Sequence, residues 1–193
     1  MSKMPSNNFQ QRKKDILSKL DKSSKKSWDK KILELCEKIN SLGNYYTTSS
    51  CSGRVVLMID QDKKEKGLFI KVYHNLISFQ DFKKDLDNIA KKNKKLIKFK
   101  LEPCILHVAC KSPEEAFKIY NIAKFSGWKK SGLISFGNRA IVELNSTEKL
   151  EFPIIDKGKI LVDDIFIKVI VKESNKKFKK IWEKIEKLEK LLI

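Results

Sequence analysis

Apolar runs of strand length occur in neighbouring pairs along this chain, and only a short break separates the two members of a pair. Residues 54–60 and 68–74 flank a polar turn, and residues 96–101 and 104–110 flank Pro103. Strands joined so closely pair antiparallel, because a parallel connection needs a dozen or more residues. The spacing therefore predicts an α+β protein with a mixed or antiparallel sheet and several flanking helices.

Helical patterns with recognisable start signals lie between the strands. In Ser112-Pro113-Glu114-Glu115, a capping serine precedes a first-turn proline and a glutamate at the third helical position. Ser27 and Ser78 also precede apolar residues at helical spacing. We expect helices over 9–20, from Ser27 to Gly43, from Ser78 through Ile89, from Ser112 to Gly127 and over 174–192, and further strands over 45–49, 131–136, 139–144, 152–155 and 165–171.

The two ends of the chain differ in character. Residues 1–8 are predicted to form a flexible tail, and residues 174–193 a C-terminal amphipathic helix. That helix places one apolar stripe on one side, which favours a packed terminal helix over a dimer or partner helix. The stripe consists of Phe178, Ile181, Trp182, Ile185, Leu188 and Leu192. At 193 residues, we expect a single domain over 1–193.

Several protein classes are disfavoured. No strand is followed by a glycine-rich phosphate loop, so a dinucleotide-type doubly wound sheet is not expected. No apolar run approaches the roughly 20 residues of a membrane span, and no signal peptide opens the chain, so we expect a cytoplasmic protein. Cys104, His107 and Cys110 share one strand, but its alternation directs His107 away from both cysteines. We therefore expect no metal site.

The charge points to a polyanionic partner. Lysine and arginine number 42 against 24 acidic residues, a net charge of +18. Most of the excess lies in residues 1–30, 83–100 and 172–193. Nucleic acid is the first candidate partner for such a chain, and an anionic membrane is the second.

The most unusual stretch is Thr47-Thr48-Ser49-Ser50-Cys51-Ser52-Gly53-Arg54. Hydroxyls and backbone N–H groups around a glycine suit an anionic group, and Arg54 can bind a carboxylate or phosphate through two nitrogens. The alternative is a solvated loop. Cys51 also permits a cysteine–histidine hydrolase with His74 or His107.

The remaining candidates each have a structural alternative. His74 ends a predicted strand, where it is either at the edge of an active site or a structural hydrogen-bonding residue. Asp29 follows Ser27, a position where an acid is also favoured by the helix dipole. Arg139 is one of only three arginines, and Asn138-Arg139 opens a strand much as Gly53-Arg54 does.

These residues resemble the signature of the tRNA wybutosine-synthesising protein three family. Its Ser-x-Ser-Ser-Cys-x-Gly-Arg pattern is matched by residues 47–54, with Thr47 replacing the first serine. Its other elements are matched, in order, by Ser27-Trp28-Asp29, Ile39-Asn40, Glu102-Pro103-Cys104-Ile105-Leu106-His107-Val108 and Ser126-Gly127-Trp128-Lys129-Lys130-Ser131-Gly132. The match departs from the family around His74, where Tyr73 and Asn75 replace an expected tryptophan and serine.

The resemblance implies a fold unlike the Rossmann-like methyltransferases. It also implies an S-adenosylmethionine-dependent enzyme that methylates the N4 ring nitrogen of the wyosine-type tricyclic base beside the anticodon of tRNA-Phe. Lysine-rich segments would then bind RNA, and Tyr45, Tyr46, Tyr73 or Trp128 could stack on the exposed base, although core positions are the alternative for such aromatics.

Site roles follow from that resemblance. Asp29 is the first candidate for a general base and His74 the second. Candidate cofactor-binding residues are Ser49, Ser50, Cys51, Ser52, Gly53 and Arg54, and supporting residues are Thr47, His107 and Arg139. The main rival is a non-catalytic basic RNA-binding protein, which would have no use for S-adenosylmethionine.

Overall fold

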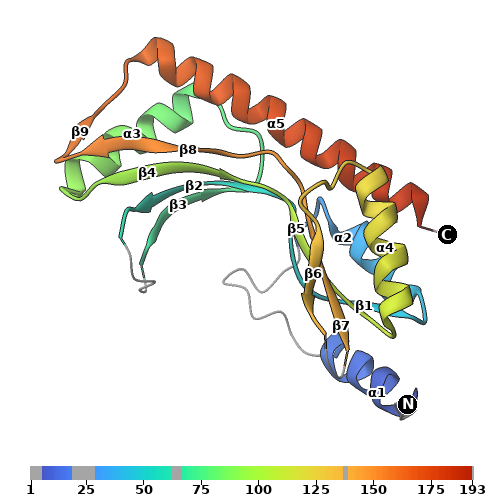
Figure 1. Ribbon diagram of the computed structural model, residues 1–193. Helices are drawn as coiled ribbons and strands as arrows, with labels where there is room; N and C mark the ends of the chain where they lie inside the picture. The colour runs from blue at the N-terminus through green and yellow to red at the C-terminus, as the bar shows by residue number, and fades with distance from the viewer. Residues whose placement is uncertain (1–5, 19–28, 62–66, 137–138, 193) are drawn as a thin grey trace. The chain divides into compact units, whose positions relative to one another are not determined.

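The computed structural model describes residues 6–18, 29–61, 67–136 and 139–192 (Figure 1). Contacts divide the chain into two compact units. Unit 1 comprises residues 1–52, 104–147 and 182–193, and unit 2 comprises 53–103 and 148–181. Each unit has its own sheet, and every strand pair in both sheets is antiparallel.

Unit 1 contains a four-stranded sheet in the order β1-β5-β7-β6. Its elements are α1 (Ser6–Leu17), α2 (Leu33–Ser41), β1 (Tyr45–Cys51), β5 (Ile105–Cys110), α4 (Pro113–Phe125), β6 (Gly132–Ser135) and β7 (Ala140–Asn145). Helices α2 and α4 pack on one sheet face, where the alternating positions are buried and apolar: Leu106, Val108, Val142 and Leu144. We call this the helix-packed face of unit 1.

Unit 2 contains a five-stranded sheet in the order β3-β2-β4-β8-β9. Its elements are β2 (Arg54–Ile59), β3 (Phe69–Tyr73), α3 (Phe79–Lys92), β4 (Ile97–Glu102), β8 (Leu150–Asp156), β9 (Lys159–Ile160) and the first part of α5 (Asp164–Leu191). Strand β4 alternates fully buried apolar residues with half-buried polar ones. Its buried side faces α3, where the ring of Phe82 meets that of Phe99 edge-on.

Helices α3 and α5 cover the same side of the unit 2 sheet (Figure 1). Asn175 of α5 bonds both the N–H and the C=O of Ile77, just before α3. Lys83 of α3 pairs with Asp164 at 2.9 Å. These bonds hold the start of α5 to α3.

One expected strand is wrong, because residues 165–171 form the first two turns of α5. The run is rich in β-branched residues, which favours a strand locally. The buried residues Ile167, Ile170 and Val171 instead continue the helical spacing of Phe178 and Ile181. Asp163 accepts a hydrogen bond from the N–H of Phe166 at 2.8 Å and so caps the new start.

The other strands and helices are confirmed, with boundary shifts of a few residues. The expected pairing of the two runs that flank Pro103 is wrong, because they form β4 and β5, which belong to different sheets. Ser78 and Ser112 cap α3 and α4 as predicted, since each accepts a bond from the N–H three residues on. Helix α1 begins at Ser6, within the predicted tail, and residues 1–5 lie outside the described chain. Ser27 also lies outside it, and α2 begins after Ile32 without a side-chain cap. The two-residue strand β9 was not expected.

The described residues contain no helix with the length and apolar character needed to cross a membrane.

Candidate functional site

Strand β1 directs the hydroxyls of the 47–52 segment to two different faces. Residues 45, 47 and 50 lie opposite Cys110, Val108 and Leu106 of β5, on the helix-packed face. Ser49 and Cys51 lie opposite His107 and Ile105, on the other face. Thr48 is the extra residue of a β-bulge, which lets Thr47 and Ser50 share a face although they are three apart. The motif therefore presents two separate sets of side chains.

The inward set consists of Thr47 and Ser50 on the helix-packed face, and both form hydrogen bonds within unit 1. The Thr47 side chain bonds Asn40 of α2, whose Oδ1 also accepts from the Thr47 N–H at 2.8 Å. A hydrogen bond also joins Ser50 to the thiol of Cys36, and burial raises the pKa of that thiol to about 12. These hydroxyls anchor β1 to α2.

Two hydrogen bonds join Asp29 and Ser52 at the end of the segment. Oδ2 of Asp29 accepts a hydrogen bond from the Ser52 N–H at 3.2 Å and another from the Ser52 hydroxyl. Oδ1 accepts a long bond from the N–H of Lys31 at 3.4 Å. Ser52 is fully buried, and Asp29 is half-buried. Two residues that are 23 positions apart are therefore held together at the end of β1.

His107 lies between two polar residues on the outward face of unit 1, which is the sheet face opposite the helix-packed face. The strand registers align Ser49 with His107 and His107 with Glu143 of β7. Nε2 of His107 is 3.0 Å from Oε2 of Glu143. His107 is half-buried, although the strand that carries it is largely apolar. Glu143 is not among the residues predicted from the sequence, since its relation to His107 depends on strand register.

Arg54 lies in unit 2, where two side chains hold its guanidinium. Its Nε donates to Oε2 of Glu102 at 2.6 Å, and the two residues are direct cross-strand neighbours. Its Cζ lies 4.9 Å from the centre of the Phe69 ring, a cation–π distance. Within the described chain, the two Nη atoms have no hydrogen-bond partner, so this fork can receive a planar anion.

Gly53 and His74 flank Arg54 in different ways. Gly53 has φ +89°, a left-handed conformation that favours glycine and lets the chain turn between β1 and β2. The β2–β3 register pairs Val55 with Tyr73, so His74 follows at the strand end where Arg54 begins β2. Within unit 2, Arg54, Glu102 and His74 are thus grouped at one end of the sheet.

Arg139 is separated from the other candidates in unit 1. Its Nη1 donates to the hydroxyl of Tyr46 at 2.8 Å, and it precedes Ala140, which lies across β5 from Tyr45. This is the opposite end of β1 from Ser52. Its contacts are those of a residue that orders the Tyr46 side chain.

The aromatic residues considered for base stacking are mostly enclosed. Tyr46 and Trp128 have no exposed surface, and Tyr45 is 8% exposed. The indole N–H of Trp128 donates to the carbonyl of Lys184 at 3.1 Å. Their core alternative is therefore confirmed, and the structure gives these three no surface for a base.

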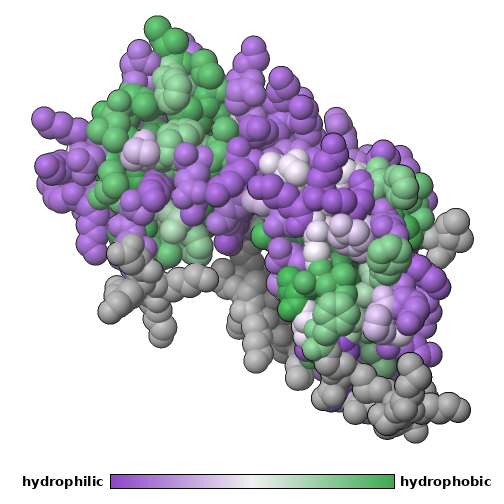
Figure 2. Space-filling view, viewed as in Figure 1, coloured by the Kyte–Doolittle hydropathy of each residue, from purple (hydrophilic) through white to green (hydrophobic). Residues whose placement is uncertain are grey.

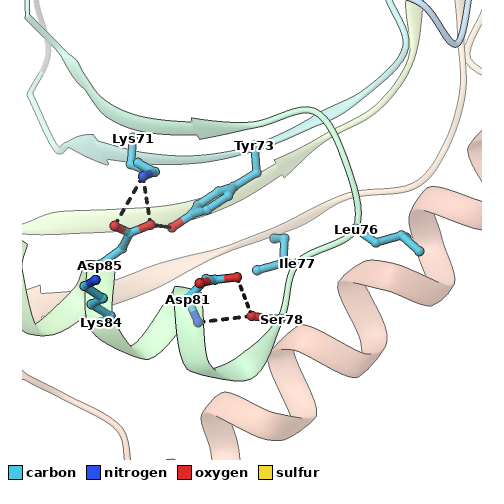
Figure 3. Close-up of a pocket in the computed structure, with 8 residues that line it drawn as sticks. All are labelled: Lys71, Tyr73, Leu76, Ile77, Ser78, Asp81, Lys84 and Asp85. Atoms are coloured by element: carbon cyan, nitrogen blue, oxygen red, sulfur yellow. Dashed lines mark hydrogen bonds and ion pairs between the residues drawn. The ribbon is translucent and has the colours of Figure 1, made fainter.

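Tyr73 lines a pocket of about 320 Å³ in unit 2 (Figure 3). Its hydroxyl donates to Oδ2 of Asp85 at 2.6 Å, and Lys71 pairs with the same carboxylate at 3.0 Å. Burial raises the pKa of Tyr73, and its bond to Asp85 raises it further. Burial alone would raise the pKa of Asp85, but the bonds from Tyr73 and Lys71 outweigh it and lower that pKa. These groups satisfy one another and tie β3 to α3.

Comparisons with known proteins agree with one another. The family model described as Methyltransferase TYW3 matches residues 11–193. A relative from Thermococcus sibiricus, named tRNA(Phe) 7-((3-amino-3-carboxypropyl)-4-demethylwyosine(37)-N(4))-methyltransferase, is 34% identical over 94% of this chain and 93% of its own. A relative of the same name from Methanocaldococcus jannaschii is 38% identical over 79% of each chain. The solved PH1069 protein from Pyrococcus horikoshii matches with a TM-score of 0.85 at 33% identity, over 96% of this chain and 94% of that one.

Proposed function

This chain belongs to the TYW3 methyltransferase family, and from that membership we propose that it methylates the N4 ring nitrogen of a demethylwyosine nucleotide at position 37 of tRNA(Phe), with S-adenosylmethionine as the methyl donor. Relatives named for this reaction align with nearly the whole chain, so neither of its units is missing from the comparison. Both sheets of the described residues are antiparallel, unlike the parallel sheet of Rossmann-like methyltransferases, and the sequence has no glycine-rich phosphate loop after a strand.

The donor groups fit S-adenosylmethionine, which supplies an electrophilic methyl group on a sulfonium. Its amino-acid end carries a carboxylate, the partner that a guanidinium fork binds through two nitrogens. Arg54 offers that fork, because Glu102 occupies only its Nε. We assign Arg54 to this carboxylate. Glu102 and the Phe69 ring would fix the plane of the guanidinium before the ligand binds.

Asp29 is our candidate for the base that takes the proton from ring nitrogen N4. A neutral ring nitrogen that gains a methyl group must lose a proton, and a positioned carboxylate can accept it. Ser52 orients this carboxylate through two hydrogen bonds, as a third group orients the base in other active sites. His74 remains the second candidate.

The outward and inward sets of β1 divide the remaining roles. Ser49 is exposed and shares its face with His107, so we assign it to ligand contact and His107 to support. Thr47 and Ser50 would act by holding β1 on α2, since their hydroxyls are engaged there. Cys51 and Gly53 complete the segment, and Gly53 supplies the turn.

The match to relatives over nearly the whole chain is the observation that carries this proposal. Its direct test is incubation of the protein with S-adenosylmethionine and tRNA(Phe) that contains the demethylated precursor. We expect the digested nucleoside to gain the mass of one methyl group. Tight tRNA binding without methyl transfer or S-adenosylmethionine binding would instead favour a non-catalytic RNA-binding protein.

The cofactor assignment has its own test in calorimetric titration with S-adenosylmethionine. Arg54→Ala is expected to weaken binding about 10- to 100-fold, the scale of a lost charge-assisted pair. Arg12→Ala in α1 is the matched control and is expected to bind like the wild type. Equal affinities for all three proteins would overturn the assignment of Arg54.

A further inference from the structure

Six lysines gather where two distant segments of unit 2 meet. Lys91, Lys92, Lys94 and Lys95 surround the C-terminal end of α3, and Lys157 and Lys159 flank the β8–β9 turn; we call these six residues the lysine pad. The two segments form one end of unit 2 (Figure 1), and hydrophilic side chains project from the edge of that end, beside a hydrophobic area, in the space-filling view (Figure 2). All six residues are exposed.

The contact between the two segments is close at Gly158. A Cβ placed on this glycine would lie 2.8 Å from Nζ of Lys94 and 3.1 Å from the carbonyl oxygen of Ala90. Gly158 thus lets the turn approach the end of α3. The pad is a product of tertiary structure, since its two halves are more than 60 residues apart in the sequence.

In the part of the chain that the structure describes, acidic neighbours do not neutralise the pad. Asp87 pairs with Lys83, and Asp60 pairs with Lys98. Asp156 lies across the turn from Lys159, but no ion pair joins them in the described chain. Six positive charges therefore stand together, at a cost in mutual repulsion.

Helix stability explains only part of this arrangement. Lys91 and Lys92 lie in the last turn of α3, where cations interact favourably with the helix dipole. Lys157 has no such explanation. Its φ of +49° places a long side chain in the left-handed region, where glycine or asparagine is preferred. A charge kept in a strained position, beside five like charges, indicates a function for the charge itself.

We propose that the lysine pad, which lies at the opposite end of β4 from the Arg54–Glu102 pair, binds the sugar–phosphate backbone of the tRNA substrate. The proposal rests on the proposed function for its RNA partner. The pad contains only ammonium groups, with no arginine fork or aromatic ring among its six residues. Such a set contacts phosphates as point charges and reads no bases. Its contribution is affinity and orientation, independent of RNA sequence.

Salt dependence of tRNA binding tests the pad. The pad variant is Lys91→Gln, Lys94→Gln, Lys95→Gln and Lys157→Gln together. The matched control is Lys172→Gln, Lys176→Gln, Lys179→Gln and Lys180→Gln, four exposed lysines of α5. They belong to another of the lysine-rich segments, and this proposal assigns them no phosphate contact. Each variant lowers the net charge by the same amount, so general electrostatic attraction falls equally in both.

We expect the pad variant to lose about 3 from the slope of log affinity against log salt, at roughly 0.7–0.9 for each lost phosphate contact. At a salt concentration of about 0.1 M, its KM for tRNA should rise about tenfold or more. The kcat at saturating tRNA and the S-adenosylmethionine affinity should not change. The α5 control should stay within about threefold of the wild type in KM.

A charge-preserving variant separates charge from fold. Arginine at the same four positions keeps the positive charge, so it should restore the salt slope of tRNA binding. If the glutamine variant lost its slope because it misfolded, arginine would not restore it. Equal salt slopes in the pad variant and the α5 control would overturn the proposal. If the wild type binds tRNA but transfers no methyl group, the proposed function fails, and the slopes still decide whether the pad binds RNA.

Discussion

Asp29 accepts two hydrogen bonds from a single residue, Ser52, through the main-chain N–H and the side-chain hydroxyl. The pair joins the segment before α2 to the end of β1 and fixes one carboxylate oxygen. A base that must meet a ring nitrogen gains from such orientation, because proximity and alignment contribute much of the rate.

Asp29→Asn tests the base directly. The amide cannot accept the proton, so we expect kcat to fall about 100- to 10,000-fold, the usual contribution of general base catalysis. Calorimetric affinity for S-adenosylmethionine should change less than about threefold. Equal losses in turnover and cofactor affinity would mean that Asp29 binds rather than accepts the proton.

Ser52→Ala removes the hydroxyl bond but leaves the main-chain N–H bond to Asp29. We expect a smaller loss, about 10-fold in kcat, with an unchanged affinity for S-adenosylmethionine. A double variant with Asp29→Asn should be no slower than Asp29→Asn alone, because Ser52 would act only through the carboxylate. An additive loss in single-turnover assays would assign Ser52 a separate role.

Ser49 and Ser50 form a matched pair of adjacent serines on opposite faces of β1. Ser50→Ala should lower the free energy of unfolding by about 1 kcal/mol, because its bond to the buried Cys36 is lost, and should leave KM unchanged. Ser49→Ala should reduce kcat/KM and leave stability within about 0.5 kcal/mol, since its side chain is exposed. Chemical denaturation and steady-state kinetics on both variants would show the reverse pattern if the assignment of faces were wrong.

Local signals in the sequence predicted much of the fold. The caps at Ser78 and Ser112 and the apolar runs that pair as β2 and β3 are short-range features, so they needed no knowledge of the tertiary structure. The strand predicted over 165–171 is wrong. Its β-branched residues favour a strand locally, whereas packing against the unit 2 sheet stabilises the helix α5. Two compact units could not be foreseen, since β1 and β2 are nearly contiguous in sequence but join different sheets.

The sequence predicted which residues belong to the candidate site. It did not predict which side chains bond one another there. Hydroxyls, glycine and arginine within eight positions indicate an anion site by their chemistry. Which hydroxyls face inward depends on the bulge at Thr48, and no residue pattern marks it. The pairing of His107 with Glu143, and of Arg54 with Glu102, depends on strand register, which the sequence does not specify residue by residue.

Asp85 and Tyr73 should make the stability of the protein depend on pH. The pKa of Asp85 is lowered in the folded state, so its contribution is present above about pH 4 and is lost as pH falls through the folded pKa. The pKa of Tyr73 is raised, so its contribution is present below about pH 10 and is lost above it. Between these limits Asp85→Asn should lower the free energy of unfolding by about 1–3 kcal/mol. Urea denaturation at several pH values should show this difference shrinking below pH of about 4, and a constant difference would refute the assignment.

The β8–β9 turn offers a prediction in the opposite direction, toward higher stability. Lys157 and Gly158 both have positive φ, at +49° and +78°, as in the type I′ turns that favour Asn-Gly. Lys157→Asn should therefore raise the free energy of unfolding by about 0.5–1 kcal/mol. Gly158→Ala should lower it by about 1–2 kcal/mol or more, because a methyl group there meets the carbonyl oxygen of Ala90 as well as an unfavourable φ. Thermal and urea denaturation of both variants would check the signs. If the lysine pad binds RNA, Lys157→Asn should also reduce the salt slope of tRNA binding by about 1, so that one substitution stabilises the fold and weakens its interaction with the substrate.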